Sequence, residues 1–223
     1  MTTFKKVFEA FDNIDQVVKT IESDCQPFLK NLGVGDPIDK LFELADRRPR
    51  NGLMRGYKID GTFFAKTARD DRQPLDTSPR THEVVDQWFF DRFRFRYRSS
   101  GVFCTNKYST ARGYGTPYLV FPVGNYTACW SDKITDLYSV LKRESVAQRG
   151  TLNDDIVDRI QTILEGGEYK QQPITFSELD RHQPARSFMG SSGTEFMVAV
   201  KSYYLVSFEL VDVYNVSVKR TND

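Results

Sequence analysis

Apolar residues recur every three or four positions near the beginning of the chain and at shorter, strand-like spacings from Gly52 onward. Over residues 4–32, these steps place the apolar side chains on one stripe, which predicts an amphipathic helix. Pro27 should kink or end this helix. A second helix is predicted over residues 38–45, so we expect an N-terminal helical region covering residues 1–48.

Residues 49–223 have the pattern of a largely β domain, in which short apolar segments are separated by Gly, Pro and Asp. The apolar segments 102–105 and 118–123 are expected at the centre of the sheet. Residues 67–81 are polar and rich in turn-forming residues, which indicates a loop.

Two helices are predicted within this second region. Thr81 can cap a helix that includes Val84, Val85, Trp88 and Phe89. Residues 152–164 repeat apolar positions at helical spacing, and Gly166 follows them as a stop signal.

The C-terminal part of the chain predicts a β-hairpin. Glu195 opens an apolar strand, Lys201 and Ser202 form the expected turn, and a second β pattern covers residues 203–217. A carboxylate at the first residue of such a strand lies at the rim of the sheet, where the backbone holds it rigidly.

Residues 92–98 alternate arginine with aromatic residues, and a period of two predicts a strand with its arginines on one face. That face could bind a nucleic-acid backbone, but the aromatic side chains would point to the core and could not stack on bases. A solvated strand face is the simpler interpretation. The arginines concerned are Arg92, Arg94, Arg96 and Arg98.

Composition narrows the class of protein. A chain of 223 residues with 39% hydrophobic residues can bury a sizeable core, which excludes a disordered protein. The net charge of +1 gives no overall attraction to nucleic acid. Three cysteines without paired spacing suggest neither a disulfide framework nor a metal site. Without a signal peptide or an apolar segment of about 20 residues, we expect a cytoplasmic protein that uses neither membrane nor metal.

Three separated segments carry candidate chemistry. Arg55 ends an apolar lead-in and is followed at once by Gly56; Thr105 lies in a second apolar segment; and Glu195 opens a third. Ala111 and Tyr114-Gly115 follow the second segment. In this order, the segments resemble the mono-ADP-ribosyltransferase superfamily, in the subgroup that uses Arg, then Ser or Thr, then Glu. The chain looks most like transferases of bacteriophages and bacterial toxins.

The resemblance implies an α+β fold, a split β-sandwich of two packed sheets with the helical region before it. It also implies NAD as co-substrate and transfer of ADP-ribose to a macromolecular acceptor, protein or nucleic acid, with release of nicotinamide. Such chemistry needs a clamp for phosphates, close backbone approach to a flat carboxamide, and a carboxylate that stabilises a developing ribosyl cation.

Roles follow from the resemblance for each matched position. Arg55 would contact the NAD phosphates or ribose, Gly56 the nicotinamide amide, and Thr105 would orient the catalytic Glu195. Further residues are expected near NAD or the acceptor. Those near NAD are Tyr114 and Arg98, and those near the acceptor are Gly193, Thr194 and His182 in or next to the loop 185–194.

Several alternatives stay open at the level of sequence. Arginine-modifying members carry Gln or Glu two residues before the catalytic glutamate, where this chain has Gly193, so the acceptor need not be arginine. Ser109 or Thr110 could supply the hydroxyl in place of Thr105. Glu178 and Glu209 are reserve carboxylates. The alternative function is a non-catalytic module that binds nucleic acid or protein through residues 92–98.

Overall fold

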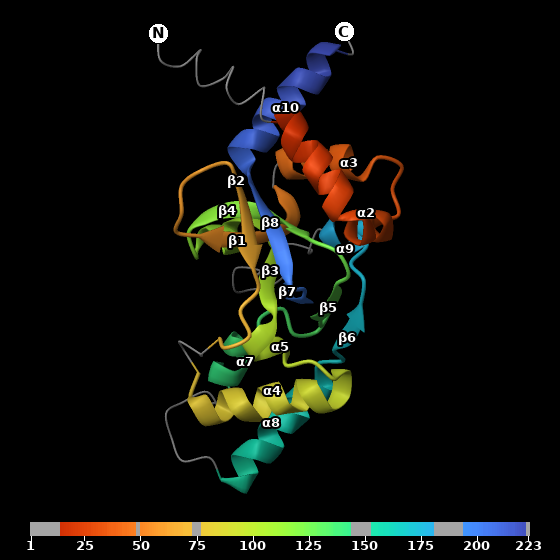
Figure 1. The fold of residues 1–223 in the computed structure, drawn as a ribbon. Coiled ribbons are helices and arrows are strands. Elements are labelled where there is room, and N and C mark those ends of the chain that lie inside the picture. Colours follow the sequence, from red (N-terminus) through yellow and green to blue (C-terminus); the bar gives the residue numbers. More distant parts are fainter. Residues whose placement is uncertain (1–13, 48–49, 73–76, 144–152, 181–193, 222–223) are drawn as a thin grey trace.

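The computed structural model describes residues 14–47, 50–72, 77–143, 153–180 and 194–221, which combine helices with one antiparallel sheet (Figure 1). The α+β class expected from the sequence is therefore confirmed. The strands are β1 (Asn51–Tyr57), β2 (Phe63–Thr67), β3 (Val102–Lys107), β4 (Thr116–Pro122), β5 (Thr127–Trp130), β6 (Lys170–Gln172), β7 (Glu195–Ala199) and β8 (Ser202–Ser207). The helices are α2 (Gln26–Leu32), α3 (Pro37–Asp46), α4 (Pro79–Phe93), α5 (Tyr97–Ser100), α6 (Tyr108–Arg112), α7 (Leu137–Arg143), α8 (Asp154–Gly166), α9 (Phe176–Leu179) and α10 (Phe208–Thr221).

The described strands form a single sheet in the order β2-β8-β4-β1-β3-β7-β5-β6, instead of the two packed sheets expected from the sequence. At the centre of this order, β1 and β3 pair at few positions. The β1–β3 ladder pairs Asn51 with Lys107 and Met54 with Thr105, with an irregularity between them. From Met54 to Tyr57, β1 pairs with β4. Two four-stranded halves therefore meet at this ladder, and Arg55 is the first residue of β1 beyond its last pair.

β7 and β8 do not form the predicted hairpin. β7 pairs with β3 and β5, whereas β8 pairs with β2 and β4, so the chain crosses between the two halves of the sheet at Val200 and Lys201. The Lys201 carbonyl accepts a hydrogen bond from the Ala68 amide at 2.9 Å. A tight turn and a short crossover both place polar residues between two apolar strands, so the pattern alone does not distinguish them.

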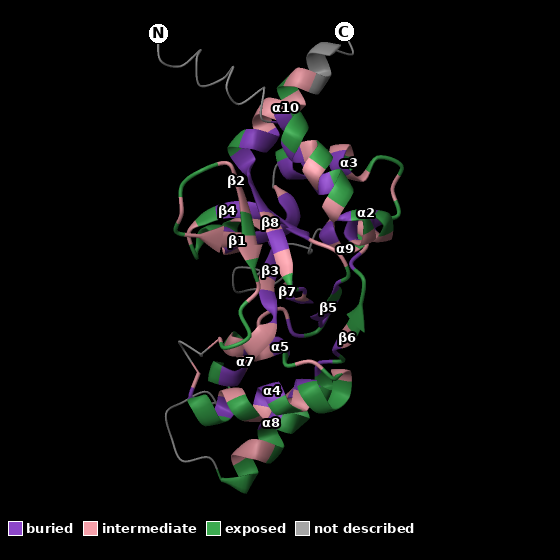
Figure 2. Cartoon of the chain, viewed as in Figure 1, coloured by how far each residue is buried: buried purple, intermediate pink, exposed green. Residues whose placement is uncertain are grey.

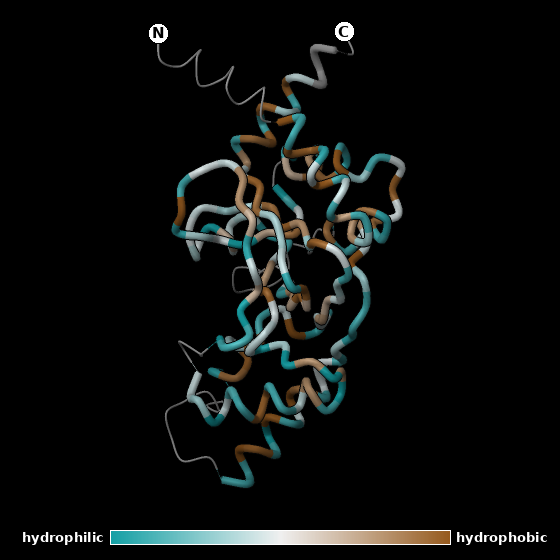
Figure 3. The backbone as a smooth tube through the Cα atoms, viewed as in Figure 1, coloured by the Kyte–Doolittle hydropathy of each residue, from teal (hydrophilic) through white to brown (hydrophobic). Residues whose placement is uncertain are grey.

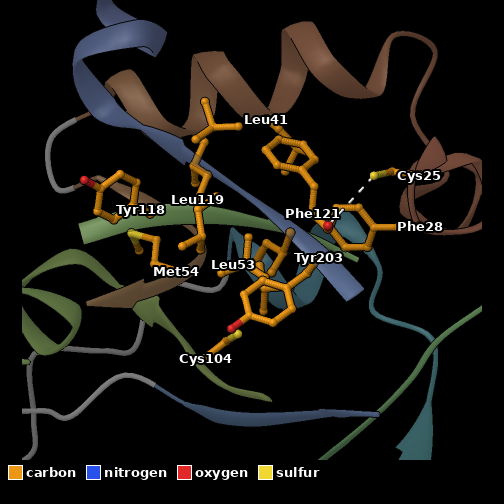
Figure 4. Close-up of a cluster of buried hydrophobic side chains, with 14 of the residues drawn as sticks. Cys25, Phe28, Leu41, Leu53, Met54, Cys104, Tyr118, Leu119, Phe121 and Tyr203 are labelled. Carbon is orange, nitrogen blue, oxygen red and sulfur yellow. Dashed lines mark hydrogen bonds between the residues drawn. The ribbon is translucent and has the colours of Figure 1, made fainter. Parts of the chain in front are cut away.

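The N-terminal helices share a hydrophobic core with the sheet (Figures 2 and 4). The rings of Phe28 in α2 and Phe42 in α3 meet that of Phe121 in β4 edge-on, with centroids 6.1 and 6.3 Å apart. The Cys25 thiol points to the Phe121 carbonyl oxygen at 3.8 Å (Figure 4). Burial of such aromatic surface stabilises the contact between helices and sheet by several kcal/mol, on the order of 2 kcal/mol for each side chain.

The predicted helices of this region are confirmed within the described residues. Residues 14–24 are helical, the helix is interrupted at Cys25, and α2 begins just before Pro27, as the proline predicts. Gly33 ends α2 in the left-handed conformation. Residues 1–13, the start of the predicted helix, and the domain boundary at 48–49 lie outside the described residues.

A second cluster lies at the other end of the molecule, where α4, α5, α7 and α8 pack against β5 and β7 (Figures 1 and 3). Phe89 and Tyr97 are fully buried there, and the ring of Phe89 meets that of Tyr169 at 5.0 Å. This aromatic packing fixes α5 against α4, and α5 carries Arg98.

Residues 92–98 do not form the predicted strand. α4 continues to Phe93, Arg94 ends it with a left-handed φ of 58°, and α5 begins at Tyr97. Packing of Tyr97 outweighs the local alternation. Its ring contacts those of Phe89 and Phe93 in α4, and its hydroxyl contacts Oγ1 of Thr127 and Nε2 of Gln171. Arg92, Arg94 and Arg96 are exposed while Arg98 is partly buried, so the four arginines do not share the strand face that the alternation predicts.

Two boundaries also differ from the sequence-based prediction. Ser78, not Thr81, is the N-cap of α4, since its hydroxyl accepts from the Thr81 amide at 3.1 Å and Pro79 occupies the first turn. The strand predicted over 203–217 ends at Ser207, and α10 follows directly. Among the described helices, none is both long and apolar enough to cross a membrane.

Candidate functional site

Glu195 and Thr105 lie side by side at the centre of the sheet. Glu195 is the first residue of β7, and its amide donates to the Thr135 carbonyl at 3.0 Å. The β3–β7 register places Thr105 directly opposite Glu195. Directly opposite residues of antiparallel strands project to the same face with Cβ atoms about 5 Å apart. The structure thus brings together the two side chains that the sequence proposed as a pair.

The alternative hydroxyls lie elsewhere. Ser109 and Thr110 are in α6, beyond the end of β3, and Ser109 is exposed. Among the reserve carboxylates, Glu178 accepts from the Thr175 amide in a capping box of α9, and Glu209 is exposed in the first turn of α10. Glu195 is therefore the carboxylate that lies opposite a hydroxyl-bearing residue of the neighbouring strand, and the Thr105 hydroxyl itself accepts from the Lys107 amide at 3.3 Å.

The charge partner of Glu195 is Arg98. Nη1 of Arg98 lies 3.3 Å from Oε1 of Glu195, and the two side chains are 13% and 23% exposed. Burial raises the pKa of Glu195, the Arg98 and Arg72 guanidinium groups oppose this effect, and the Asp136 carboxylate adds to it. A partly buried carboxylate with one arginine partner can bind hydroxyl groups or stabilise a nearby positive charge.

Three arginines gather around Phe103 next to this carboxylate. The guanidinium carbon of Arg72 lies 3.8 Å from the centroid of the Phe103 ring, and that of Arg98 lies 4.7 Å from it. Arg55 donates from Nη1 to the Phe103 carbonyl at 3.2 Å, which bridges β1 and β3 beyond the end of their ladder. The three cationic groups come from β1, α5 and the loop after β2.

The cations are close enough to repel one another. Burial, together with the positive charges of Arg98 and Arg55, lowers the pKa of Arg72 to about 10, while Glu195 and Tyr114 oppose this shift. Nη1 of Arg72 is buried and has no hydrogen-bond partner among the described residues. Three guanidinium groups beside one carboxylate leave an excess of positive charge, which suits a bound ligand with two phosphate groups.

Arg72 is a site residue that was not predicted from the sequence. It lies in the polar loop predicted over 67–81, where no spacing or motif distinguishes it from Arg69. Its position depends on a hydrogen bond from its own amide to the Ser99 carbonyl at 3.1 Å, which joins the loop to α5. Such a contact between segments distant in sequence leaves no local signal.

Gly56 allows a close contact between backbones, as expected from the sequence, but the contact is with residues 111–115 of the same chain. A Cβ atom at this position would lie 2.1 Å from the Ala111 carbonyl oxygen and 3.0 Å from the Gly115 amide nitrogen. The segment from α6 to Gly115 therefore packs directly on β1 beside Arg55. Tyr114 in this segment is 71% exposed and lies at the edge of the arginine group, since its phenol influences the pKa of Arg72.

The residues expected near the acceptor are described only in part. Gly193 and His182 lie outside the described residues, as does most of the loop 185–194. Thr194 is buried, and its amide donates to Oδ1 of Asn106 at 3.0 Å, while Nδ2 of Asn106 donates to the Glu178 carbonyl at 3.2 Å. Asn106 therefore fixes the chain just before Glu195.

Asp86 of α4 holds the backbone that carries Arg98. Its side chain is buried, Oδ1 accepts from the amides of Arg98 at 2.9 Å and Ser99 at 3.3 Å, and Oδ2 accepts from the Ser99 hydroxyl at 2.6 Å. The Ser99 hydroxyl also contacts Nε2 of His82 at 3.1 Å. Because one buried carboxylate satisfies several donors, α5 has a fixed position relative to the site.

We expect Asp86→Ala to lower the free energy of unfolding by about 3 kcal/mol, because it leaves the α5 amides buried without an acceptor. Asp86→Asn, which keeps one side-chain oxygen, should lose about half of that. Urea unfolding followed by circular dichroism measures both values. A loss below 1 kcal/mol for Asp86→Ala would show that α5 does not depend on this carboxylate.

Within the described residues, no group of three or more His, Cys, Asp or Glu side chains is arranged to hold a metal ion. Comparison with known proteins gives no further assignment: no family model, no curated protein and no solved structure matches this chain.

Proposed function

We propose that the chain is an NAD-dependent mono-ADP-ribosyltransferase that transfers ADP-ribose to a macromolecular acceptor, protein or nucleic acid, and releases nicotinamide. One observation supports the proposal above the others: Arg55, Arg72 and Arg98 gather around Phe103 beside Glu195 and its strand neighbour Thr105. Phosphate-binding groups and a catalytic carboxylate are the two tools that cleavage of the nicotinamide–ribose bond requires.

One feature of the sheet supports the proposal. The two four-stranded halves meet at the β1–β3 ladder, and Arg55 is the first residue of β1 beyond its last pair. An ADP-ribosyltransferase-like split sheet would bind NAD at this junction. Arg55, Arg72 and Arg98 would hold the diphosphate, with the exposed Tyr114 at the edge of the site. In this proposal, Gly56 allows the α6 segment to approach the site and makes its nicotinamide contact through the backbone alone.

The proposed reaction balances without a further reactant. The bond between ribose C1′ and the nicotinamide nitrogen breaks, and its electron pair leaves with nicotinamide, which becomes neutral. The Glu195 carboxylate binds ribose hydroxyl groups and stabilises the cation-like ribosyl group, while Thr105 orients that carboxylate. A nucleophilic atom of the acceptor then forms the new bond to C1′ and loses its proton to solvent.

Arg72→Met tests the proposed phosphate site. Methionine keeps apolar contact with the Phe103 ring but removes the charge, so we expect the Kd for NAD to rise about 10- to 100-fold. NAD-dependent thermal stabilisation, followed by calorimetric titration, measures the change.

Arg69→Met is the matched control, because Arg69 belongs to the same loop, is 70% exposed and pairs with Asp71. Its substitution should leave NAD affinity within twofold of the wild type. Equal losses in both variants, or no stabilisation of the wild-type chain by NAD, would contradict the assigned site.

A further inference from the structure

Arg98 and Glu195 have conflicting tasks in the proposed reaction. Arg98 would bind the diphosphate and Glu195 the ribose, yet in the ligand-free chain they pair with each other at 3.3 Å. Each group therefore uses, in the ion pair, the polar atoms with which it would bind its part of the substrate. Substrate binding must replace this ion pair before both groups can act.

The surroundings of Arg98 favour movement of its side chain alone. Its amide is held by Asp86 at 2.9 Å, so the backbone stays fixed. Its guanidinium lies over the Phe103 ring, which Arg72 also covers at 3.8 Å. Stacking on a ring does not use the N–H donors of a guanidinium, so these donors can bind an anion. Arg98 can thus change its partner by a movement of the side chain while Asp86 holds the backbone of α5.

The charges around Phe103 favour this movement once an anion is present. In the ligand-free site, Arg98 is repelled by Arg72 and held by Glu195, and the pKa of Arg72 reflects that repulsion. A diphosphate between Arg72, Arg55 and Arg98 would replace repulsion by attraction among all three. It offers Arg98 more negative charge than a single carboxylate does.

We propose that Arg98 is a positioning residue that exchanges partners, from Glu195 in the empty site to the diphosphate in the occupied one. The arrival of the diphosphate thereby releases the Glu195 carboxylate for the ribose hydroxyl groups. This inference rests on the proposed function. It adds that the diphosphate half of the substrate prepares the carboxylate, so the site is inactive toward nicotinamide riboside, which has no diphosphate.

Titration with inorganic pyrophosphate, in buffer without divalent cations, tests the exchange. Glu195→Gln removes the competing charge, and we expect pyrophosphate to bind this variant about tenfold more tightly than the wild type. The same substitution in an Arg98→Met background should give less than a twofold gain, because no partner is left to release. Thermal unfolding of each variant checks that the fold is retained.

Asp136→Asn separates the exchange from simple relief of repulsion. The Asp136 carboxylate is close enough to raise the pKa of Glu195, yet its oxygens accept from the Ser139 amide and hydroxyl at the start of α7. Its neutralisation should change pyrophosphate affinity less than twofold. An equal gain in this variant would overturn the exchange, as would a tenfold gain from Glu195→Gln in the Arg98→Met background.

Absence of pyrophosphate binding in every variant would also overturn the exchange. Transfer of label from NAD to a cell lysate by the wild-type chain, measured in parallel, distinguishes failure of the partner exchange from failure of the proposed function. Labelling with no Arg98-dependent gain contradicts the partner exchange only, whereas absence of labelling together with absence of pyrophosphate binding contradicts the proposed function itself.

Discussion

Glu195→Gln is expected to lower the rate of ADP-ribose transfer at saturating NAD by about a thousandfold, with little change in stability. The substitution keeps the size of the side chain, and the hydrogen bond from the backbone amide of residue 195 to the Thr135 carbonyl stays in place. It removes the negative charge that stabilises the ribosyl cation, and preorganised charges of this kind contribute a factor of about 10² to 10³ or more to catalysis. Initial rates of nicotinamide release measure the loss.

Glu209→Gln supplies the control for this experiment. Glu209 is an exposed glutamate in the first turn of α10, so its neutralisation should leave the rate within twofold of the wild type. If Glu195→Gln retained more than a tenth of the wild-type rate, Glu195 would not be the catalytic carboxylate.

Gly56→Ala is expected to destabilise the chain by about 3 kcal/mol or more. The added methyl group would lie 2.1 Å from the Ala111 carbonyl oxygen and 3.0 Å from the Gly115 amide nitrogen. These are backbone atoms of one packed segment, so relief requires that the α6 segment move away from β1. Urea unfolding measures the change, and NAD binding should weaken in parallel because Arg55 is adjacent.

Gly166→Ala adds the same methyl group where the structure leaves room. Gly166 is the last residue of α8, and outside its chain neighbours and the backbone of its own helix no described atom lies within 4 Å of the position of its Cβ. Alanine should stabilise the helix there by about 0.5 kcal/mol, since it loses less conformational freedom on folding. A loss below 1 kcal/mol for Gly56→Ala would refute the close packing of the α6 segment on β1.

Local patterns predicted the elements whose boundaries depend on local chemistry. Pro27 marks the interruption before α2, and the apolar segments 102–105 and 118–123 correspond to β3 and β4 near the sheet centre. In these cases a residue type or an apolar segment restricts the backbone directly. The pairing of Thr105 with Glu195 is different, because it follows from the resemblance to the transferases and not from a local pattern; the β3–β7 register places the two residues opposite each other.

Local patterns do not predict contacts between segments that are distant in the sequence. Residues 92–98 alternate as a strand does, yet α4 ends at Arg94 and the buried Tyr97 is bonded through its hydroxyl to the distant Thr127 and Gln171. β7 and β8 follow each other with one short connection, but each pairs within a different half of the sheet. Arg72 enters the site only because its loop is bonded to α5. Pairing of strands and docking of loops depend on the whole fold.

Incubation of NAD with the purified chain and a cell lysate tests whether the chain is a transferase. We expect release of nicotinamide together with transfer of an adenine-side label to protein or nucleic acid, and loss of both with Glu195→Gln. Intact NAD and an unlabelled lysate, with a folded wild-type chain, would show that the chain has no such activity.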